Sequence, residues 1–119
     1  MHYMLMVYYD EERWAQLPEA QRQKIMQESD EFRQDIVTSG HFRASARLQP
    51  TSTATTVREL SSKRVITDGP FAETKEQLGG FLLIECKDLD EAISIASRFP
   101  MVRLGGAIEV RPVIPASAR

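Results

Sequence analysis

The chain has 119 residues, of which 42% are hydrophobic and 27% charged, and its formal net charge is −2. This length matches one domain that buries its own core, and the absence of any Lys/Arg run longer than a pair argues against direct nucleic-acid binding. No apolar run approaches the roughly 20 residues that cross a bilayer, and no secretory leader pattern is present, so we expect no membrane partner.

The single cysteine, Cys86, excludes an internal disulfide and fits a reducing compartment. Its neighbour Glu85 is acidic, which favours a core position for Cys86 over a role as nucleophile. We therefore expect a cytoplasmic protein.

The first half of the chain predicts a strand, a helix and a second strand. His2 to Tyr9 is rich in β-forming residues and apolar on both alternating faces, so both faces need a cover. A helix is expected to begin at Pro18 and to stop at Gly40. Trp14 lies before it, in a lead-in that either folds over a cleft or packs on the helix start. The expected apolar stripe of the helix is Ile25, Met26, Phe32, Ile36 and Val37.

A weaker strand is expected from His41 to Leu48, and a β-hairpin follows. Its arms are 54–58 and 63–67, separated by Glu59-Leu60-Ser61-Ser62. The long polar segment 68–81 comes next and holds three of the six glycines. A loop this long inside a small domain tends to be functional.

The last third predicts a strand, a helix and a strand. Phe81 to Cys86 is strongly apolar, and Asp88 with Glu91 has the form of a capping box. The helix should end at Pro100, and the last strand should run over 107–113 at a sheet edge, because Pro112 lacks a ladder donor. We expect one domain over 1–113 and a flexible tail over 114–119.

The order β-α-β, hairpin, β-α-β predicts an α+β fold with the ferredoxin-like split βαβ pattern and an inserted hairpin. Two helices cover only one face of such a sheet. At roughly 25 cal/mol per Å², leaving Met4, Met6, Phe81 and Leu83 exposed would cost several kcal/mol. A second copy of the same sheet is the simplest cover, so we expect a homodimer with its sheets face to face.

The segment from Thr67 to Phe81, TDGPFAETKEQLGGF, resembles the signature of the DGPF-domain proteins, a branch of the YCII-related family. The resemblance extends over residues 1–113. It also covers Tyr3-Met4-Leu5, Trp14, Leu48-Gln49-Pro50, Thr53-Ala54-Thr55-Thr56-Val57-Arg58 and Glu109-Val110-Arg111-Pro112. It implies a dimeric α+β barrel of ferredoxin-like subunits, with clefts between sheet and helices that bind small organic substrates.

Relatives in the wider family use a His on the first helix, with an acidic partner, as the proposed acid/base pair. Residues 18–39 contain no His, and the nearest, His41, follows the expected helix stop. Genes of the DGPF branch commonly neighbour genes for extracytoplasmic-function sigma factors, which implies a regulatory setting and a possible sigma-factor partner.

Asp68 and His41 are the candidate catalytic groups. Asp68 at a strand end can remove a substrate proton or, alternatively, hold the Asp-Gly-Pro turn, in which Gly69 adopts a conformation open to few other residues. Histidine as a residue type suits a general base near neutral pH, so His41 is a candidate for that role, or it interacts favourably with the helix C-terminus.

Five further residues are candidates for ligand binding. Glu73 and Lys75 share one side of the loop and form either a polar clamp or a plain solvated pair. Glu109 and Arg111 alternate onto the face that meets the expected partner sheet and should pair with each other or across the dimer, and Tyr8 lies on the corresponding face of the first strand. With Asp68 and Lys75 they would line a small polar pocket.

Two histidines and one cysteine at unrelated positions form no zinc pattern, so we expect no metal and no cofactor. Two hypotheses remain open. The protein is a small-molecule enzyme with acid/base chemistry, or it is a non-catalytic ligand-sensing or regulatory protein that works with a sigma factor.

Overall fold

The computed structural model describes residues 1–118. Its main sheet has the strand order β2-β5-β1-β6, and every neighbouring pair is antiparallel. Its members are β1 (His2–Tyr9), β2 (Phe42–Arg47), β5 (Gln77–Glu85) and β6 (Ala107–Pro112). The protein is therefore a mixed α+β structure, and within residues 1–118 the sheet does not close into a barrel.

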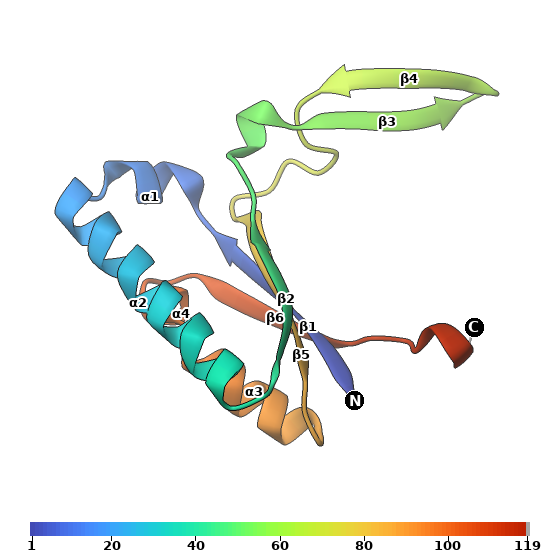
Figure 1. Ribbon diagram of the computed structural model, residues 1–119. Helices are drawn as coiled ribbons and strands as arrows, with labels where there is room; N and C mark the ends of the chain where they lie inside the picture. Colours follow the sequence, from blue (N-terminus) through green and yellow to red (C-terminus); the bar gives the residue numbers. More distant parts are fainter. Residues whose placement is uncertain (119) are drawn as a thin grey trace.

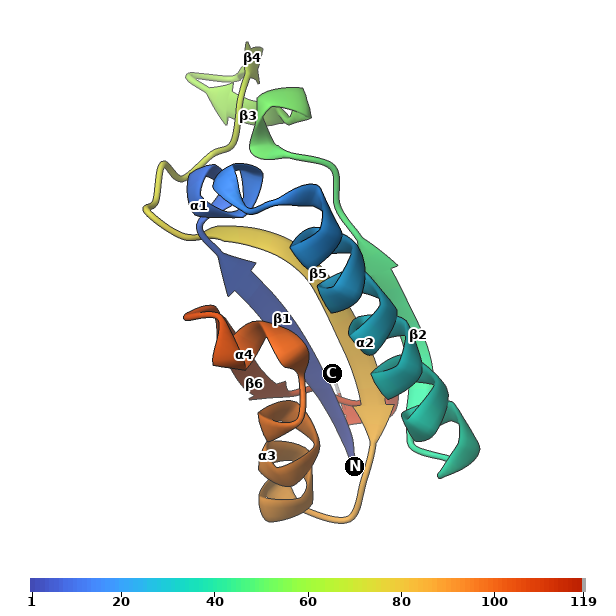
Figure 2. The same cartoon turned by 90° about the vertical axis from the view of Figure 1, so that its left-hand side faces the viewer.

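Four helices lie on one face of this sheet (Figures 1 and 2). They are α1 (Glu11–Gln16), α2 (Glu19–Thr38), α3 (Leu89–Ser97) and α4 (Pro100–Arg103). Asp10 caps α1 by accepting hydrogen bonds from the backbone N–H groups of Glu12 and Arg13, and Asp88 caps α3 through the N–H of Glu91 at 2.9 Å. No helix of the described residues is long and apolar enough to span a membrane.

The core lies between the sheet and the helices. Every second residue of β1 points into it, as the two-residue period of a strand requires. Tyr3, Leu5 and Val7 are buried on this face, whereas Met4 and Met6 point to the other. The ring of Phe32 on α2 meets the ring of Phe99 edge to face, with 5.3 Å between centroids.

The other face of the sheet is open. It carries the side chains that alternate with the core, and several of them are only half buried (Met4, Met6, Tyr8, Phe81, Leu83). None of the described helices covers it (Figure 1). We call this surface the open face.

The hairpin β3 (Thr55–Leu60) and β4 (Lys63–Asp68) extends away from the body of the molecule (Figure 1). Ser61 and Ser62 have positive φ angles of 50° and 65°, the condition for the two-residue turn that matches strand twist. The projecting hairpin agrees with a radius of gyration of 16.3 Å, above the roughly 13.5 Å of a compact chain of this length.

Most expected elements are present, with four corrections. The lead-in around Trp14 is the separate helix α1, and β5 begins four residues early at Gln77. α3 ends at Ser97, before Pro100, and Pro100 begins α4, as a proline at a first helical position does. Val37 is 41% exposed and does not belong to the buried stripe of α2. β6 is an edge strand, as its proline predicted.

Candidate functional site

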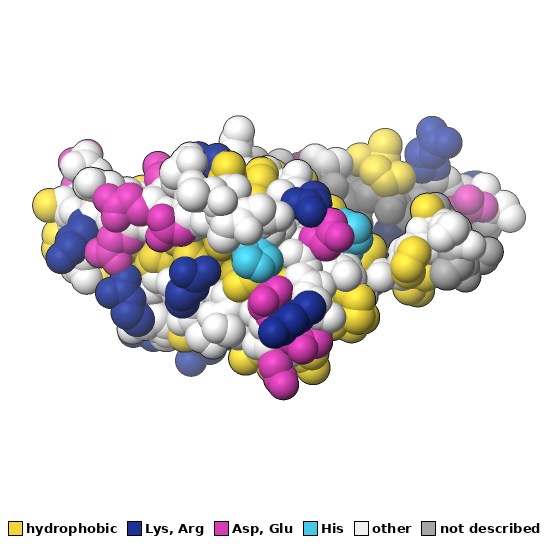
Figure 3. All heavy atoms as spheres, turned by 60° about the horizontal axis from the view of Figure 1, so that its bottom comes forward, with side chains coloured by type: hydrophobic (Ala, Val, Ile, Leu, Met, Phe, Trp, Pro, Cys, Tyr) yellow, Lys and Arg dark blue, Asp and Glu magenta, His cyan; other side chains and the backbone are white. Residues whose placement is uncertain are grey.

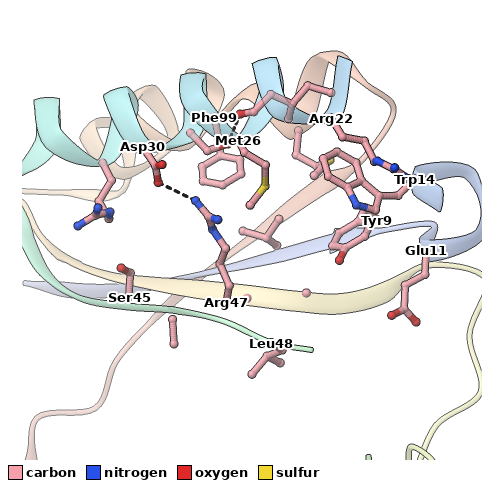
Figure 4. Close-up of a pocket in the computed structure, with 18 of the residues that line it drawn as sticks. Tyr9, Glu11, Trp14, Arg22, Met26, Asp30, Ser45, Arg47, Leu48 and Phe99 are labelled. Atoms are coloured by element: carbon pink, nitrogen blue, oxygen red, sulfur yellow. Dashed lines mark hydrogen bonds and ion pairs between the residues drawn. The ribbon is translucent and has the colours of Figure 1, made fainter. Parts of the chain in front are cut away.

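A cleft of about 910 Å³ lies between α1 and α2 on one side and the strands β1, β2 and β5 on the other (Figure 4). This volume falls within the range of small-molecule sites. We call it the α2 cleft. It exists because the N-terminal half of α2 stands off the sheet: of that half only Ile25 is buried, and Phe32 is the next buried residue along the helix.

The sheet side of the α2 cleft is formed partly by residues with small or absent side chains. Ser45 of β2 and Gly79 and Gly80 of β5 line it, with Ser45 opposite Leu82 and Gly80 opposite Arg47 in the ladder. A Cβ on Gly80 would lie 2.7 Å from the backbone oxygen of Ala46, and one on Gly79 would lie 2.0 Å from Cε1 of Tyr9. Both distances are too short for real Cβ contacts, so only glycine fits at these positions without a shift.

The end of the α2 cleft is an aromatic corner. The rings of Tyr9 and Trp14 meet edge to face at 6.0 Å between centroids, with 61° between their planes. Met26 of α2 and Phe99 add further apolar surface (Figure 4). Burial, and secondarily the charge of Glu11, raises the pKa of the Tyr9 hydroxyl, which keeps it neutral.

Polar contacts hold α1, and hence Trp14, in place. The Glu11 carboxylate accepts hydrogen bonds from the Thr51 backbone N–H at 2.9 Å and from its hydroxyl at 2.5 Å. The Gln77 side chain accepts from the Glu11 backbone N–H at 3.0 Å and donates to the carbonyl of Thr74 at 2.6 Å. The long loop 69–76 is thus connected through Gln77 to the wall of the cleft.

Charged side chains border the α2 cleft. Arg47, on the edge strand β2, reaches across to Asp30 on α2, with 2.6 Å between Nη2 and Oδ1 (Figure 4). Arg22 donates from Nη1 to the Ala15 carbonyl at 3.0 Å. Arg33 lies further along α2 on the same cleft. An apolar interior with a few charged groups at its border is the usual make-up of a ligand site.

The sequence-predicted loop residues lie outside this cleft. Asp68 ends β4 opposite Thr55, and no hydrogen bond of its carboxylate occurs among the described residues. Gly69 has the positive φ of 96° that its place in the turn predicted. Glu73 and Lys75 are exposed, and no ion pair joins them in the described chain. Lys75 lines a second, smaller hollow beside Asp10 and Glu11.

Tyr8, Glu109 and Arg111 lie on the open face, where the strand alternation placed them. Arg111 forms an ion pair with Glu109, so these two charges satisfy each other within the chain. Neither described cavity includes any of the three. The structure therefore does not join them to Asp68 and Lys75 in one pocket.

His41 lies at the opposite end of the molecule from the aromatic corner. Its Nδ1 is 2.7 Å from the Ser39 hydroxyl and its Nε2 is 3.3 Å from Glu91, which connects the end of α2 to the start of α3. Figure 3 shows both histidines beside acidic side chains on this surface. His41 lines neither described cavity.

The residues of the cleft were mostly not predicted from the sequence. Arg22, Met26 and Asp30 repeat every four residues, the spacing of one helix face, and this was a usable signal. The charge of Arg22 obscures this signal, because charge on a helix normally marks the side that faces water. Within residues 1–118 no group of three ligating side chains could hold a metal ion.

Comparison with known proteins agrees with the expected resemblance. The model of the YCII-related domain matches residues 1–117. The chain belongs to the YCII-related family. An uncharacterised protein of Rhizobium meliloti (strain 1021) is 37% identical over 114 residues, which cover 95% of this chain and 92% of that protein.

Proposed function

We propose that this YCII-related protein binds a small organic molecule in the α2 cleft. The observation that carries the proposal is the combination of an apolar cleft of about 910 Å³, an aromatic corner and a charged border. Two glycines leave part of its sheet side without side chains, and substituting them would require a shift of Tyr9 or of the Ala46 backbone. Protein interiors are normally close-packed, so stability alone would favour side chains that fill this cleft.

The assembly that we propose is a homodimer of ferredoxin-like subunits of the DGPF branch, with the open faces packed together into an α+β barrel. The half-buried Met4, Met6, Phe81 and Leu83 support it, as does the position of α1 to α4, which all lie on the opposite face. Analytical ultracentrifugation at micromolar concentration tests it. A dimer is expected, and a monomer would contradict it.

The ligand proposal is tested by a thermal-shift screen of small organic molecules with a cleft-filling variant. Ser45 points into the cleft from β2 (Figure 4), so Ser45→Phe should abolish stabilisation by any true ligand. Thr67→Phe on the exposed strand β4 is the matched control and should keep it. Equal stabilisation of both variants by every hit would contradict the proposal.

Turnover assays of the hits then separate catalysis from sensing. Product formation supports the acid/base enzyme, whereas binding without turnover supports the sensor or regulator that works with a sigma factor. The acid/base roles of Asp68 and His41 stay predictions. Neither residue lines the α2 cleft, so the binding proposal does not depend on them.

A further inference from the structure

The ion pair between Arg47 and Asp30 crosses the α2 cleft from the sheet to the helix. The two side chains are 55% and 57% exposed, so their attraction is screened by water. Exposed pairs of this kind contribute little to stability. The guanidinium of Arg47 can therefore leave the carboxylate of Asp30 and bind another carboxylate at a small cost in free energy.

The acidic groups of the cleft are already occupied. Both oxygens of Glu11 accept hydrogen bonds from Thr51, and Glu19 accepts one from Gln23. Asp30 is paired with Arg47. A cationic ligand would therefore have to compete with bonds that the protein already makes.

The guanidinium groups have donors to spare. Each carries five N–H bonds. Among the described residues Arg47 uses Nη2 on Asp30 and Arg22 uses Nη1 on Ala15. The planar fork of Arg47 suits two parallel hydrogen bonds to a carboxylate. The aromatic corner of Tyr9 and Trp14, with Met26 beside it, offers apolar surface for a flat body.

We propose that the ligand of the α2 cleft is an organic acid, a carboxylate attached to a flat apolar body. Arg47 is its specificity-determining residue: it leaves Asp30 and binds the carboxylate of the ligand, while the apolar body packs against Tyr9 and Trp14. This assignment rests on the proposed function of the same cleft.

The experiment uses three probes of nearly equal shape: 3-phenylpropanoate, the neutral 3-phenylpropanamide and the cationic 3-phenylpropylamine. Trp14 is the single tryptophan of the chain and lines the cleft, so its fluorescence reports binding directly. Titrations at constant ionic strength should rank the anion about tenfold or more above the amide, as a charge-assisted bond implies. The amine should bind weakest.

Substitutions at Arg47 and at Asp30 should shift this ranking in opposite directions. Arg47→Met should remove the preference for the anion over the amide, and Arg47→Lys should retain part of it. Asp30→Asn should raise affinity for the anion several-fold, because the competing carboxylate is gone. Arg64→Met, on the exposed strand β4, should change nothing.

The outcomes separate this inference from the proposed function. If the protein binds the anion and the amide with equal affinity, and Ser45→Phe binds neither, the assignment of an organic acid is overturned. The same result would support the α2 cleft as a binding site. Tightest binding of the amine would equally overturn the assignment of an organic acid. No change in Trp14 fluorescence with any of the probes, together with identical thermal-shift profiles for wild type and Ser45→Phe, would count against both.

Discussion

The ring of Tyr9 lies directly over the backbone of Gly79, where a Cβ would come within 2.0 Å of Cε1 of the ring. The register of β1 against β5 shifts between Val7 and Tyr8, so Gly79 stands at an irregularity of the ladder. Gly79 belongs to the segment that carries the family resemblance, and Tyr9 forms the aromatic corner. The glycine therefore fixes the position of a wall of the cleft.

Gly79→Ala should lower the free energy of unfolding by about 1–3 kcal/mol, the range for forcing extra volume into a packed site. It should also change the fluorescence of Trp14, because Tyr9 has to move against it. Urea unfolding measures the first effect. In the Tyr9→Ala background the same substitution should cost much less, and an equal cost in both backgrounds would show that the ring is not the obstacle.

Glu11→Ala should destabilise the protein by about 1–2 kcal/mol, because it removes the charged acceptor of two hydrogen bonds that Thr51 donates. The adjacent Glu12 makes no side-chain hydrogen bond in the described structure, so Glu12→Ala is the matched control and should stay within about 0.5 kcal/mol. Thermal unfolding followed by circular dichroism compares the two. Equal effects would mean that the contact with Thr51 does not hold α1.

The interaction of Arg43 with Glu85 should make the free energy of unfolding depend on pH in the acid range. Its hydrogen bonds to Glu85, at 2.7 and 3.1 Å, and secondarily its charge lower the pKa of that carboxyl from the usual 4.5. A carboxyl group whose pKa is lower in the folded state stabilises the fold at pH values above its unfolded-state pKa. This contribution is lost as the pH falls. Wild type should therefore exceed Arg43→Met in unfolding free energy at pH 7, and the difference should shrink toward pH 2. A constant difference would contradict the assignment.

The thiol of Cys86 should react slowly with disulfide reagents in the native protein. It is buried in the core, and burial, with a smaller contribution from Glu91, raises the pKa of its thiol. A disulfide reagent at pH 8 should label the native protein far more slowly than the urea-unfolded protein. Rapid stoichiometric labelling of the native state would place Cys86 at the surface.

The strands, the hairpin and the long helices could be predicted because each has a local pattern. β1 is rich in β-forming residues, Asp88 and Glu91 have the form of a capping box, and Pro112 marks an edge. The short helix α1 was not predicted because the run from Asp10 to Arg13 is charged and directly follows a strand, although Asp10 is a good helix cap.

The cleft could not be predicted in the same way because it depends on the distance between α2 and the sheet. The charged residues of the loop favoured Asp68 and Lys75 as site residues. The cavity instead depends partly on Gly79 and Gly80, which have no side chains to fill it. Arg47 and Asp30 are 17 residues apart in sequence and belong to different elements. Nothing in either segment alone indicates that they meet.

The central claim, that the α2 cleft is the ligand site, is tested most directly by methionine methyl NMR. The chain has five methionines: Met26 and Met101 line the cleft, Met4 and Met6 lie on the open face, and Met1 is exposed. On titration with the strongest hit of the thermal-shift screen, the signals of Met26 and Met101 should shift while those of Met4 and Met6 stay. Shifts confined to Met4 and Met6, or absent from Met26 and Met101 at saturation, would contradict the account.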